Sequence, residues 1–290
     1  MSEVDGIATP WQTLPGPAGV LEQARAENFP VALRVLPRGL RGDLMALYGF
    51  ARWVDDIGDE APGDRLAALD AVEQDLLRAF EGHAEHSLLR ALTPTLRAHD
   101  LPRRPFLDLI EANRLDQRVS RMRTWDDLLA YCALSANPVG RLVLGVLGTS
   151  TPRRDELSDA ICSALQVIEH CQDVAEDFRR GRVYLPQQDL DRLGCDESAL
   201  AQAPASTALR CVVAEQVERA RALLAHGEPL LAELHGFARF AVAGFAAGGF
   251  ATCNAIERAG FDVTSRTIRA RRRDRIGWIL RLLWRAARRT

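Results

Sequence analysis

The chain has 290 residues, of which 47% are hydrophobic and 26% charged, the ordinary balance of a soluble globular protein that can bury a substantial core. Its formal net charge of -2 argues against a protein that binds nucleic acid through overall basicity, so we expect no nucleic-acid partner. The six cysteines form no CxxC pair and no zinc-type spacing with histidine, which predicts reduced thiols in a cytosolic protein.

Secretory and membrane-spanning segments are not expected. The first twelve residues, MSEVDGIATPWQ, lack the basic region and the apolar run of a signal peptide. The most apolar stretch, 237–251, is shorter than the roughly 18 apolar residues that span a bilayer, and it contains Arg239. We therefore predict a cytoplasmic protein.

Helical periodicity dominates the chain, and Pro and Gly residues fall between the helical segments. No composition break and no repeat of fixed period marks a linker, so the pattern predicts a single all-α domain. The predicted helices cover about residues 18–34, 41–60, 64–80, 86–99, 103–120, 125–148, 153–179, 206–233, 236–259 and 272–288.

The first acidic cluster closes the second predicted helix. Asp55 and Asp59 are four residues apart and share a helix face with Tyr48 and Arg52, and Asp56 lies beside them. Like charges at this spacing destabilise a helix by about a few tenths of a kcal/mol, and a helix C-terminus also disfavours negative charge. Acids placed there against local preference indicate that cations fill the site, although a solvated acidic helix end explains this cluster alone equally well.

The second acidic cluster lies on the predicted helix 153–179. Its polar side chains follow one stripe at Gln166, Glu169, Asp173 and Asp177. A basic turn containing Arg182 follows the stripe directly. His170 lies off the stripe, which favours a core or supporting role over a ligand role. A surface helix laced with salt bridges is the alternative for this cluster taken alone.

Two acidic helical stripes, each flanked by arginine, together predict a site for a metal-bound diphosphate. Carboxylate oxygens are the ligands that Mg²⁺ prefers, and Mg²⁺ completes its shell with water and substrate phosphate. Cations would reverse the sign of the site and, with the arginines, stabilise charge on a departing diphosphate. Apolar helix surfaces would protect the carbocation that remains.

The sequence resembles the squalene/phytoene synthase family over about residues 27–273. The stretches that carry the resemblance are ENFPVALRVLP (27–37), LYGFARWVDDIGDE (47–60), YCALSANPVGRLVL (131–144), LQVIEHCQDVAEDFRRGRVYLP (165–186) and AIERAGFDVTSRTIR (255–269). The two acidic motifs in this order, with GRVYLP after the second, are jointly specific. The details ENFPV, SANPVG and QDVAED look like the hydroxysqualene synthase branch of bacterial hopanoid biosynthesis.

The resemblance implies the all-α isoprenoid synthase fold, with residues 18–273 as the synthase domain and 274–290 as a basic amphipathic C-terminal helix. The two motifs are then expected to face each other across a central cavity. The implied cofactor is Mg²⁺ and the implied substrate is a prenyl diphosphate, presqualene diphosphate. Other enzymes of squalene and hopanoid synthesis are the implied partners.

Site residues follow from the resemblance position by position. Metal binding is implied for Asp55, Asp56, Asp59, Glu169, Asp173 and Asp177. Contacts with the diphosphate and the rest of the substrate are implied for Asn28, Tyr48, Arg52, Gln166, Arg182 and Arg266. Catalysis is expected to rest on Asp55, Asp59, Asp173, Asp177 and Tyr131. Tyr131 and Gln166 match polar positions that line the cavity, and either is a candidate for positioning a water.

Four positions depart from the pattern of condensing relatives. Gln172 stands where Arg is usual, Gly249 where several relatives carry Tyr, Asn28 where Ser is common, and Glu169 where many carry Asn. These changes favour one ionisation over a two-step condensation of farnesyl diphosphate. No GxGxxG motif follows a strand, so we predict that water captures the cation derived from presqualene diphosphate and gives hydroxysqualene.

Three other functions stay open. The first is a head-to-head condensing synthase that makes presqualene diphosphate, squalene or phytoene. The second is a non-catalytic helical assembly factor on the same fold, which would have no need of the five principal aspartates. The third is an all-α nucleotide pyrophosphohydrolase, against which the long apolar helices favour a lipid substrate.

The segment 266–290 carries one acid, Asp274, against many arginines. An apolar stripe runs through Ile276, Ile279, Leu280, Leu283 and Trp284, with Trp278 beside it. This pattern is typical of an interfacial membrane helix, so we expect peripheral contact with the inner face of the plasma membrane. A terminal helix packed on the domain with a solvated arginine face is the alternative.

Overall fold

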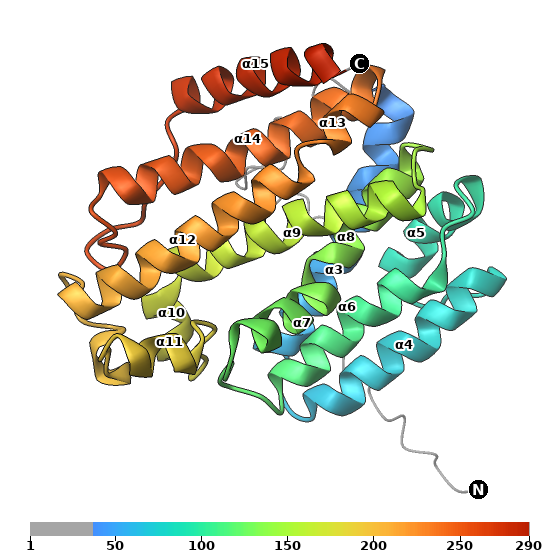
Figure 1. The fold of residues 1–290 in the computed structure, drawn as a ribbon. Coiled ribbons are helices and arrows are strands. Elements are labelled where there is room, and N and C mark those ends of the chain that lie inside the picture. The colour runs from blue at the N-terminus through green and yellow to red at the C-terminus, as the bar shows by residue number, and fades with distance from the viewer. Residues whose placement is uncertain (1–36, 290) are drawn as a thin grey trace, which may run out of the picture.

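Residues 37–289 are described by the computed structural model, and they fold into helices joined by short connections (Figure 1). The helices are α3 (Arg38–Glu60), α4 (Arg65–Glu81), α5 (Ser87–Ala98), α6 (Arg103–Asp116), α7 (Trp125–Ser135), α8 (Asn137–Val146), α9 (Pro152–Gln172), α10 (Val174–Arg179), α11 (Gln187–Arg192), the 3₁₀ helix η1 (Glu197–Ala199), α12 (Thr207–Gly227), α13 (Leu230–Glu233), α14 (Gly236–Arg258) and α15 (Arg272–Arg289). Extended pairing in this range is limited to one isolated bridge, between Arg121 and Val183. The predicted all-α class is confirmed.

Helix ends follow the capping signals of the sequence. Thr124 and Asp127 form a capping box at the start of α7, and Thr151 caps α9 ahead of a proline in its first turn. The helix α4 begins at the Asp64 cap and ends at Gly82, whose φ of 92° is the left-handed conformation that favours glycine. These local signals explain why most predicted helix boundaries lie close to the observed ones.

Three predicted helices are interrupted in the structure. The prediction 125–148 becomes α7 and α8, because Pro138 starts a new helix after Ala136. The prediction 206–233 becomes α12 and α13, which are separated at Pro229. The prediction 153–179 becomes α9 and α10, which meet at Asp173. This last break is local, since the Asp173 N–H still donates to the Glu169 carbonyl at 2.9 Å.

Buried side chains form two apolar clusters, and α9 lies where they meet. One cluster draws mainly on α3 to α6 and α8, with Phe50, Trp53 and Phe106 almost fully buried. The other draws mainly on α7 and α9 to α14. Because α9 packs on α8 as well as on α12 and α14, the second acidic motif is carried by a helix at the centre of the bundle.

Two helical stretches within residues 37–289 are long and apolar enough to cross a membrane by length and composition alone, contrary to the expectation that no stretch is. They are Trp125–Val146, with a mean hydropathy of 1.3, and Gly236–Arg258, with 1.2. The expectation missed them because each collects moderately apolar alanines and glycines rather than one unbroken run. The protein buries 44% and 56% of these windows, as the core helices of a bundle do.

Candidate active site

The first acidic motif lies on the last turn and a half of α3. Asp55 is reached by solvent, and its carboxylate accepts a hydrogen bond from Asn113 Nδ2 of α6 at 3.0 Å. Protein surrounds Asp55 closely enough that desolvation raises its pKa to about 7, and the negative charges of Asp59 and Glu169 act in the same direction. Glu169 belongs to α9, so the negative charge of the second acidic motif already acts on the Asp55 carboxylate.

Gly58 allows α6 to lie close to the Asp55 carboxylate. A Cβ atom at Gly58 would lie 2.1 Å from Asn113 Oδ1, so any larger residue would displace the side chain that holds Asp55. The Gly58 carbonyl accepts hydrogen bonds from Gln117 at 2.9 Å and from Arg65 at 3.1 Å. The end of α3 is therefore fixed by side chains from α4 and the end of α6.

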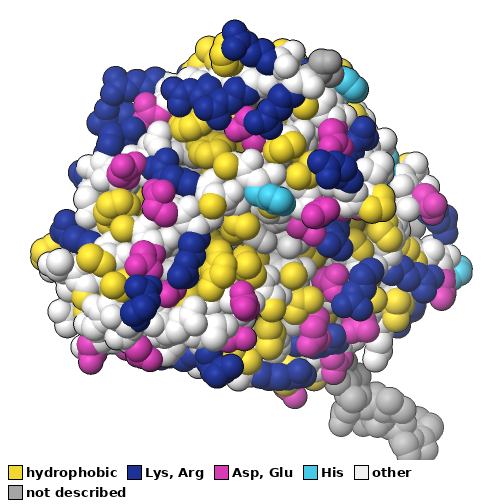
Figure 2. Space-filling view, in the orientation of Figure 1, with side chains coloured by type: hydrophobic (Ala, Val, Ile, Leu, Met, Phe, Trp, Pro, Cys, Tyr) yellow, Lys and Arg dark blue, Asp and Glu magenta, His cyan; other side chains and the backbone are white. Residues whose placement is uncertain are grey.

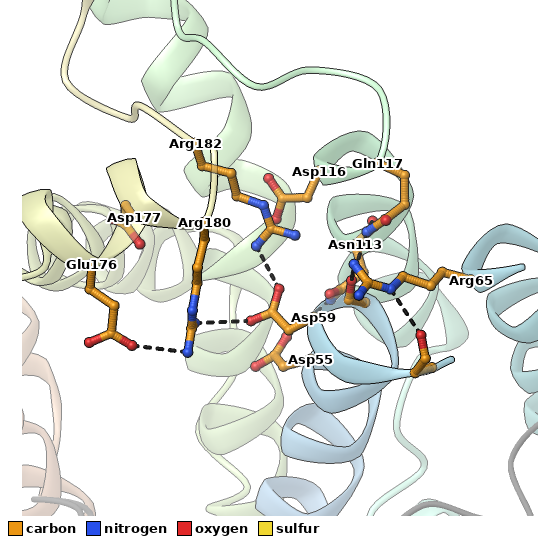
Figure 3. A network of polar contacts seen from close by, with 12 residues as sticks. Asp55, Asp59, Arg65, Asn113, Asp116, Gln117, Glu176, Asp177, Arg180 and Arg182 are labelled. Carbon is orange, nitrogen blue, oxygen red and sulfur yellow. Dashed lines mark hydrogen bonds and ion pairs between the residues drawn. The ribbon is translucent and has the colours of Figure 1, made fainter. Parts of the chain in front are cut away.

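Arginines of the turn after α10 join the two motifs (Figure 3). Arg182 contacts Asp59 at 2.5 Å, and Arg180 lies 3.6 Å from the same carboxylate. Arg180 also pairs with Glu176 of α10 at 2.9 Å. A chain of acid–arginine contacts therefore runs from α3 to α10 in the free protein.

The second motif spans the junction of α9 and α10. Burial raises the pKa of Asp173, and the neighbouring carboxylates of Asp177 and Glu176 raise it further. His170 is buried, with its Nδ1 3.7 Å from Asp177 and its Nε2 3.2 Å from the Gln166 amide nitrogen. The supporting position predicted for His170 agrees with this geometry.

A buried polar cluster next to the arginines was not assigned from the sequence. Asp116, the last residue of α6, accepts hydrogen bonds from Tyr131 at 2.7 Å and from Tyr184 at 3.0 Å. Burial raises the pKa of Asp116, which the tyrosine hydrogen bonds and Arg182 partly oppose. The His170 ring stacks on Tyr184 with ring centres 3.8 Å apart. Tyr131, which was predicted, is thus held by Asp116 and Tyr184, which were not.

The remaining predicted residues differ in how far they are buried and in which element they lie. Asp56 is 4% exposed and pairs with Arg52 at 2.9 Å, so its carboxylate is engaged within α3. Tyr48 is half-buried on the same helix. Arg266 is exposed in the segment between α14 and α15. Asn28 lies outside the described residues. The metal-binding role of Asp56 and the substrate-binding roles of these residues stay predictions.

Two of the unusual positions have structural partners. Gln172 donates from its side-chain amide to the Ile268 carbonyl at 2.5 Å, which ties the segment containing Arg266 to the second motif. A Cβ atom at Gly249 would lie 2.9 Å from Leu165 and 3.1 Å from Leu224. Leucine side chains therefore occupy the space that a tyrosine at 249 would need.

The donor chemistry of the site fits Mg²⁺. Desolvation raises the pKa of Asp55 and of Asp173, and neighbouring carboxylates add to it, namely Asp59 and Glu169 for Asp55 and Asp177 and Glu176 for Asp173; a bound cation would offset both effects. Within residues 37–289, no three acidic, histidine or cysteine side chains converge closely enough to enclose a metal ion. Arg182 and Arg180 instead neutralise Asp59.

Comparison with known proteins shows the family of the chain. The family model for squalene/phytoene synthases matches residues 23–275. The chain belongs to the squalene/phytoene synthase family. The hydroxysqualene synthase of Rhodopseudomonas palustris is 39% identical over 217 residues, which cover 73% of each protein. The 15-cis-phytoene synthase of Synechococcus elongatus is 32% identical over 231 residues, or 75% of each protein.

A solved structure agrees with the sequence relatives. The squalene synthase HpnC from Alicyclobacillus acidocaldarius superposes with a TM-score of 0.77 at 43% identity, covering 85% of this chain and 96% of that one. The chain therefore has the all-α fold of squalene synthases, and it is an isoprenoid synthase of a family that binds prenyl diphosphates. The resemblance to hydroxysqualene synthases stated from the motifs is confirmed.

Proposed function

We propose that this squalene/phytoene synthase family member converts presqualene diphosphate and water into hydroxysqualene and diphosphate. The C–O bond breaks and its electron pair leaves with the diphosphate. The resulting cyclopropylcarbinyl cation rearranges, water adds through its oxygen, and one proton is released. The observation that carries the proposal is the junction of the two acidic motifs, where Asp59 of α3 meets Arg182 and Arg180.

The arginines supply the binding and orientation of the leaving group. Arg182 is mostly shielded from solvent, with a side chain 15% exposed, and it lies between the carboxylate of Asp59 and the polar cluster around Asp116. A guanidinium in this environment binds a phosphate oxygen strongly, because little water competes for its donors. Arg180 is half exposed and can follow the diphosphate as it departs.

Mg²⁺ would be held by Asp55, Asp59, Asp173 and Asp177, with Glu169 and Asp56 as further carboxylates near the two motifs. When bound, it supplies Lewis-acid stabilisation of the diphosphate charge. The protein contributes the contact of Arg182 and Arg180 with Asp59, which links the end of α3 to the turn that follows the second motif. Because the pKa of Asp55 is raised, a cation at this carboxylate would bind in competition with a proton.

The buried polar cluster fixes the hydroxyl groups nearest to the arginines. Because Tyr131 and Tyr184 both donate to Asp116, their oxygen lone pairs stay available to accept a hydrogen bond from water. A small cavity of about 10 Å³ is lined by His170, Asp177, Arg182 and Tyr184 among others, enough for one water. These groups are the best candidates in the described chain for orienting the water that captures the cation.

Support for hydroxysqualene as product comes from relatives and from local packing. The relative from Rhodopseudomonas palustris is named hydroxysqualene synthase. The Gln172 side-chain amide donates a hydrogen bond to the Ile268 carbonyl, and Leu165 and Leu224 fill the space beside Gly249. The site thus lacks an arginine at 172 and a tyrosine at 249, two groups that the resemblance associates with condensing enzymes. The product would pass to later enzymes of hopanoid synthesis.

Head-to-head condensation of two prenyl diphosphates is the second candidate. It is favoured by the relatives named phytoene synthase and by the structural neighbour named squalene synthase. That reaction needs room for two substrates and a second ionisation, whereas hydration needs one substrate and one water.

Product analysis separates the two reactions. Purified protein with Mg²⁺ is incubated separately with farnesyl, geranylgeranyl and presqualene diphosphates, and products are identified by mass spectrometry. We expect consumption of presqualene diphosphate and incorporation of one oxygen from ¹⁸O-labelled water into the product. Efficient consumption of farnesyl diphosphate alone, with presqualene diphosphate untouched, would overturn the proposal in favour of condensation.

A further inference from the structure

The apolar surface of the described chain is concentrated on two helices. Large hydrophobic side chains that remain about half exposed or more are Phe237 (51%), Phe240 (52%), Ile276 (48%), Leu280 (64%) and Trp284 (55%). They all lie on the beginning of α14 or on α15, and we call them the apolar patch. Figure 2 shows dark blue arginine side chains gathered along the edge of the molecule where α15 lies, with yellow hydrophobic side chains between them.

The helix α15 has two apolar faces, and only one is used by the fold. Leu282 and Ala286 are buried against the bundle, and the Trp278 ring stacks on Phe250 of α14 with centres 4.4 Å apart. Ile279 and Leu283 pack at the edge of the same contact. The stripe predicted from the sequence is therefore divided, since Ile276, Leu280 and Trp284 point outward along one line of the helix.

Ion pairs fix this orientation at both ends of α15. Arg285 pairs with the buried Glu228 at 3.0 Å, and Arg289 lies 3.6 Å from the same residue. Near the other end, Asp274 pairs with Arg258 of α14 at 2.6 Å. The outward side chains are thus held in place by the fold rather than exposed by a detached tail.

The charge around the patch is positive. Asp274 is the only acid between 266 and 290, and Arg258 neutralises it. Arg281 covers the Trp278 ring at 4.6 Å, and Arg288 covers the Trp284 ring at 3.6 Å. Aliphatic side chains with tryptophan beside arginines match the boundary between acyl chains and anionic headgroups.

We propose that α15 and the beginning of α14 form a docking surface for an anionic lipid bilayer, which would hold the protein peripherally on the inner face of the plasma membrane. A second copy of the chain fits less well, because two identical arginine-rich faces would repel. Nucleic acid fits less well, because the centre of the patch is apolar where phosphates would lie. The proposal rests on this surface alone and is independent of the product made in the active site.

Vesicle co-sedimentation of the full chain tests the proposal. Vesicles of phosphatidylcholine, with or without about 30% phosphatidylglycerol, are compared at low and high salt. We expect binding to the anionic vesicles that weakens with salt and falls about tenfold or more in the Leu280→Ser, Trp284→Ser double variant. Arg281→Gln with Arg288→Gln should lose a similar factor on anionic vesicles only.

The matched control is Arg104→Gln with Arg123→Gln, which removes two highly exposed arginines, one on α6 and one just before α7, and should bind vesicles like the parent. Circular dichroism confirms that all three variants are folded at the assay temperature, so that a change in vesicle binding reports on the substituted surface. Two outcomes overturn the proposal: a parent chain that does not bind anionic vesicles, or a Leu280→Ser, Trp284→Ser variant that binds them as well as the parent does. A dimer that dissociates in this variant, without vesicle binding, would assign the patch to a second copy instead.

Discussion

Asp59 and Arg182 lie 123 positions apart in the sequence, and their side chains meet at 2.5 Å where the two acidic motifs join. The contact links the end of α3 to the turn after α10, so it closes the site across the bundle. In the free protein, arginine supplies the positive charge that Asp59 needs. A diphosphate would compete for the same guanidinium and would release Asp59 for a cation.

Replacing Arg182 should impair turnover far more than replacing the exposed Arg179. We expect Arg182→Ala to lower kcat/KM for presqualene diphosphate by about a hundredfold, since a shielded arginine is lost from the leaving-group site. Arg179→Ala is the matched control, because Arg179 is exposed on α10, and it should stay within about twofold of the parent. Equal kinetics for the two variants would remove Arg182 from the diphosphate site.

Two glycines of α3 should respond to alanine with opposite signs. In Gly58→Ala the new methyl group would meet Asn113, so we expect a loss of about 1–3 kcal/mol in the free energy of unfolding and reduced activity through Asp55. Gly42→Ala adds a methyl group where nothing lies within 4 Å, and should gain about 0.5–1 kcal/mol from helix propensity. Denaturant unfolding measures both, and a stabilised Gly58→Ala protein would contradict the close approach of α6.

Sequence periodicity located the parts of the site that lie on single helices. Asp55 and Asp59 share a face of α3 as predicted, and the negative charge of Glu169 on α9 contributes to the raised pKa of Asp55. Periodicity also predicted a continuous helix through Asp173, where the structure has a break. A regular pattern carries no signal for a local kink, because the residues on both sides keep helical spacing.

The residues that sequence reasoning missed come from elsewhere in the fold. Asn113 and Asp116 lie on α6, in a stretch with no motif of its own, and they reach the site only because α6 packs on α3 and α7. Tyr184 was within the quoted GRVYLP stretch, but nothing in the spacing indicated that its hydroxyl meets Asp116. Tertiary packing between helices is the information that a single sequence lacks here.

The pKa of Asp55, raised to about 7, predicts a pH-dependent metal requirement. Below this value the carboxyl holds a proton that Mg²⁺ must displace, so the Mg²⁺ concentration for half-maximal activity should rise as pH falls from about 8 to about 6. The pKa of Asp55 in the folded protein lies above its ordinary value of 3.8, so protonation of Asp55 stabilises the metal-free folded protein. This stabilisation is complete below about pH 3.8. That contribution is lost as pH rises through about 7.

Mg²⁺ titrations of activity and of the melting temperature at several pH values measure this dependence. Asn113→Ala removes a hydrogen bond that favours the charged carboxylate, so its Mg²⁺ requirement should become more acid-sensitive than that of the parent. Asp55→Asn should abolish the pH dependence of metal-induced stabilisation that this carboxylate causes. A half-saturating Mg²⁺ concentration that is constant from about pH 6 to 8 would contradict the role of Asp55.

Asp173 and Asp56 should separate activity from stability. Burial and the charges of Asp177 and Glu176 make the ionised Asp173 unfavourable, so Asp173→Asn should abolish turnover while leaving the metal-free melting temperature unchanged or higher. Asp56→Asn instead breaks the pair with Arg52 inside α3 and should cost about 1–3 kcal/mol. Calorimetry without metal, beside kinetics with Mg²⁺, tests the pair, and an active Asp173→Asn enzyme would refute metal binding at this position.

The cluster around Asp116 should control what happens after ionisation. In Asp116→Asn the side-chain amide can accept from one tyrosine only, so the second hydroxyl must turn and act as an acceptor. We expect a lower kcat with little change in KM, and a larger share of products that lack oxygen from water. Tyr131→Phe and Tyr184→Phe identify which hydroxyl is responsible, because each removes one donor to Asp116.

Product ratios by mass spectrometry distinguish this role from a structural one. If Asp116→Asn and both tyrosine variants lose only stability, by about 1–3 kcal/mol each for a broken buried hydrogen bond, with an unchanged product ratio, the cluster serves the fold alone. If one tyrosine variant reproduces the altered ratio of Asp116→Asn and the other does not, the sensitive hydroxyl is the one that orients water. We expect one tyrosine variant to reproduce the altered ratio, because Arg182 lies close to the cluster and a water held there would lie beside a diphosphate bound by Arg182.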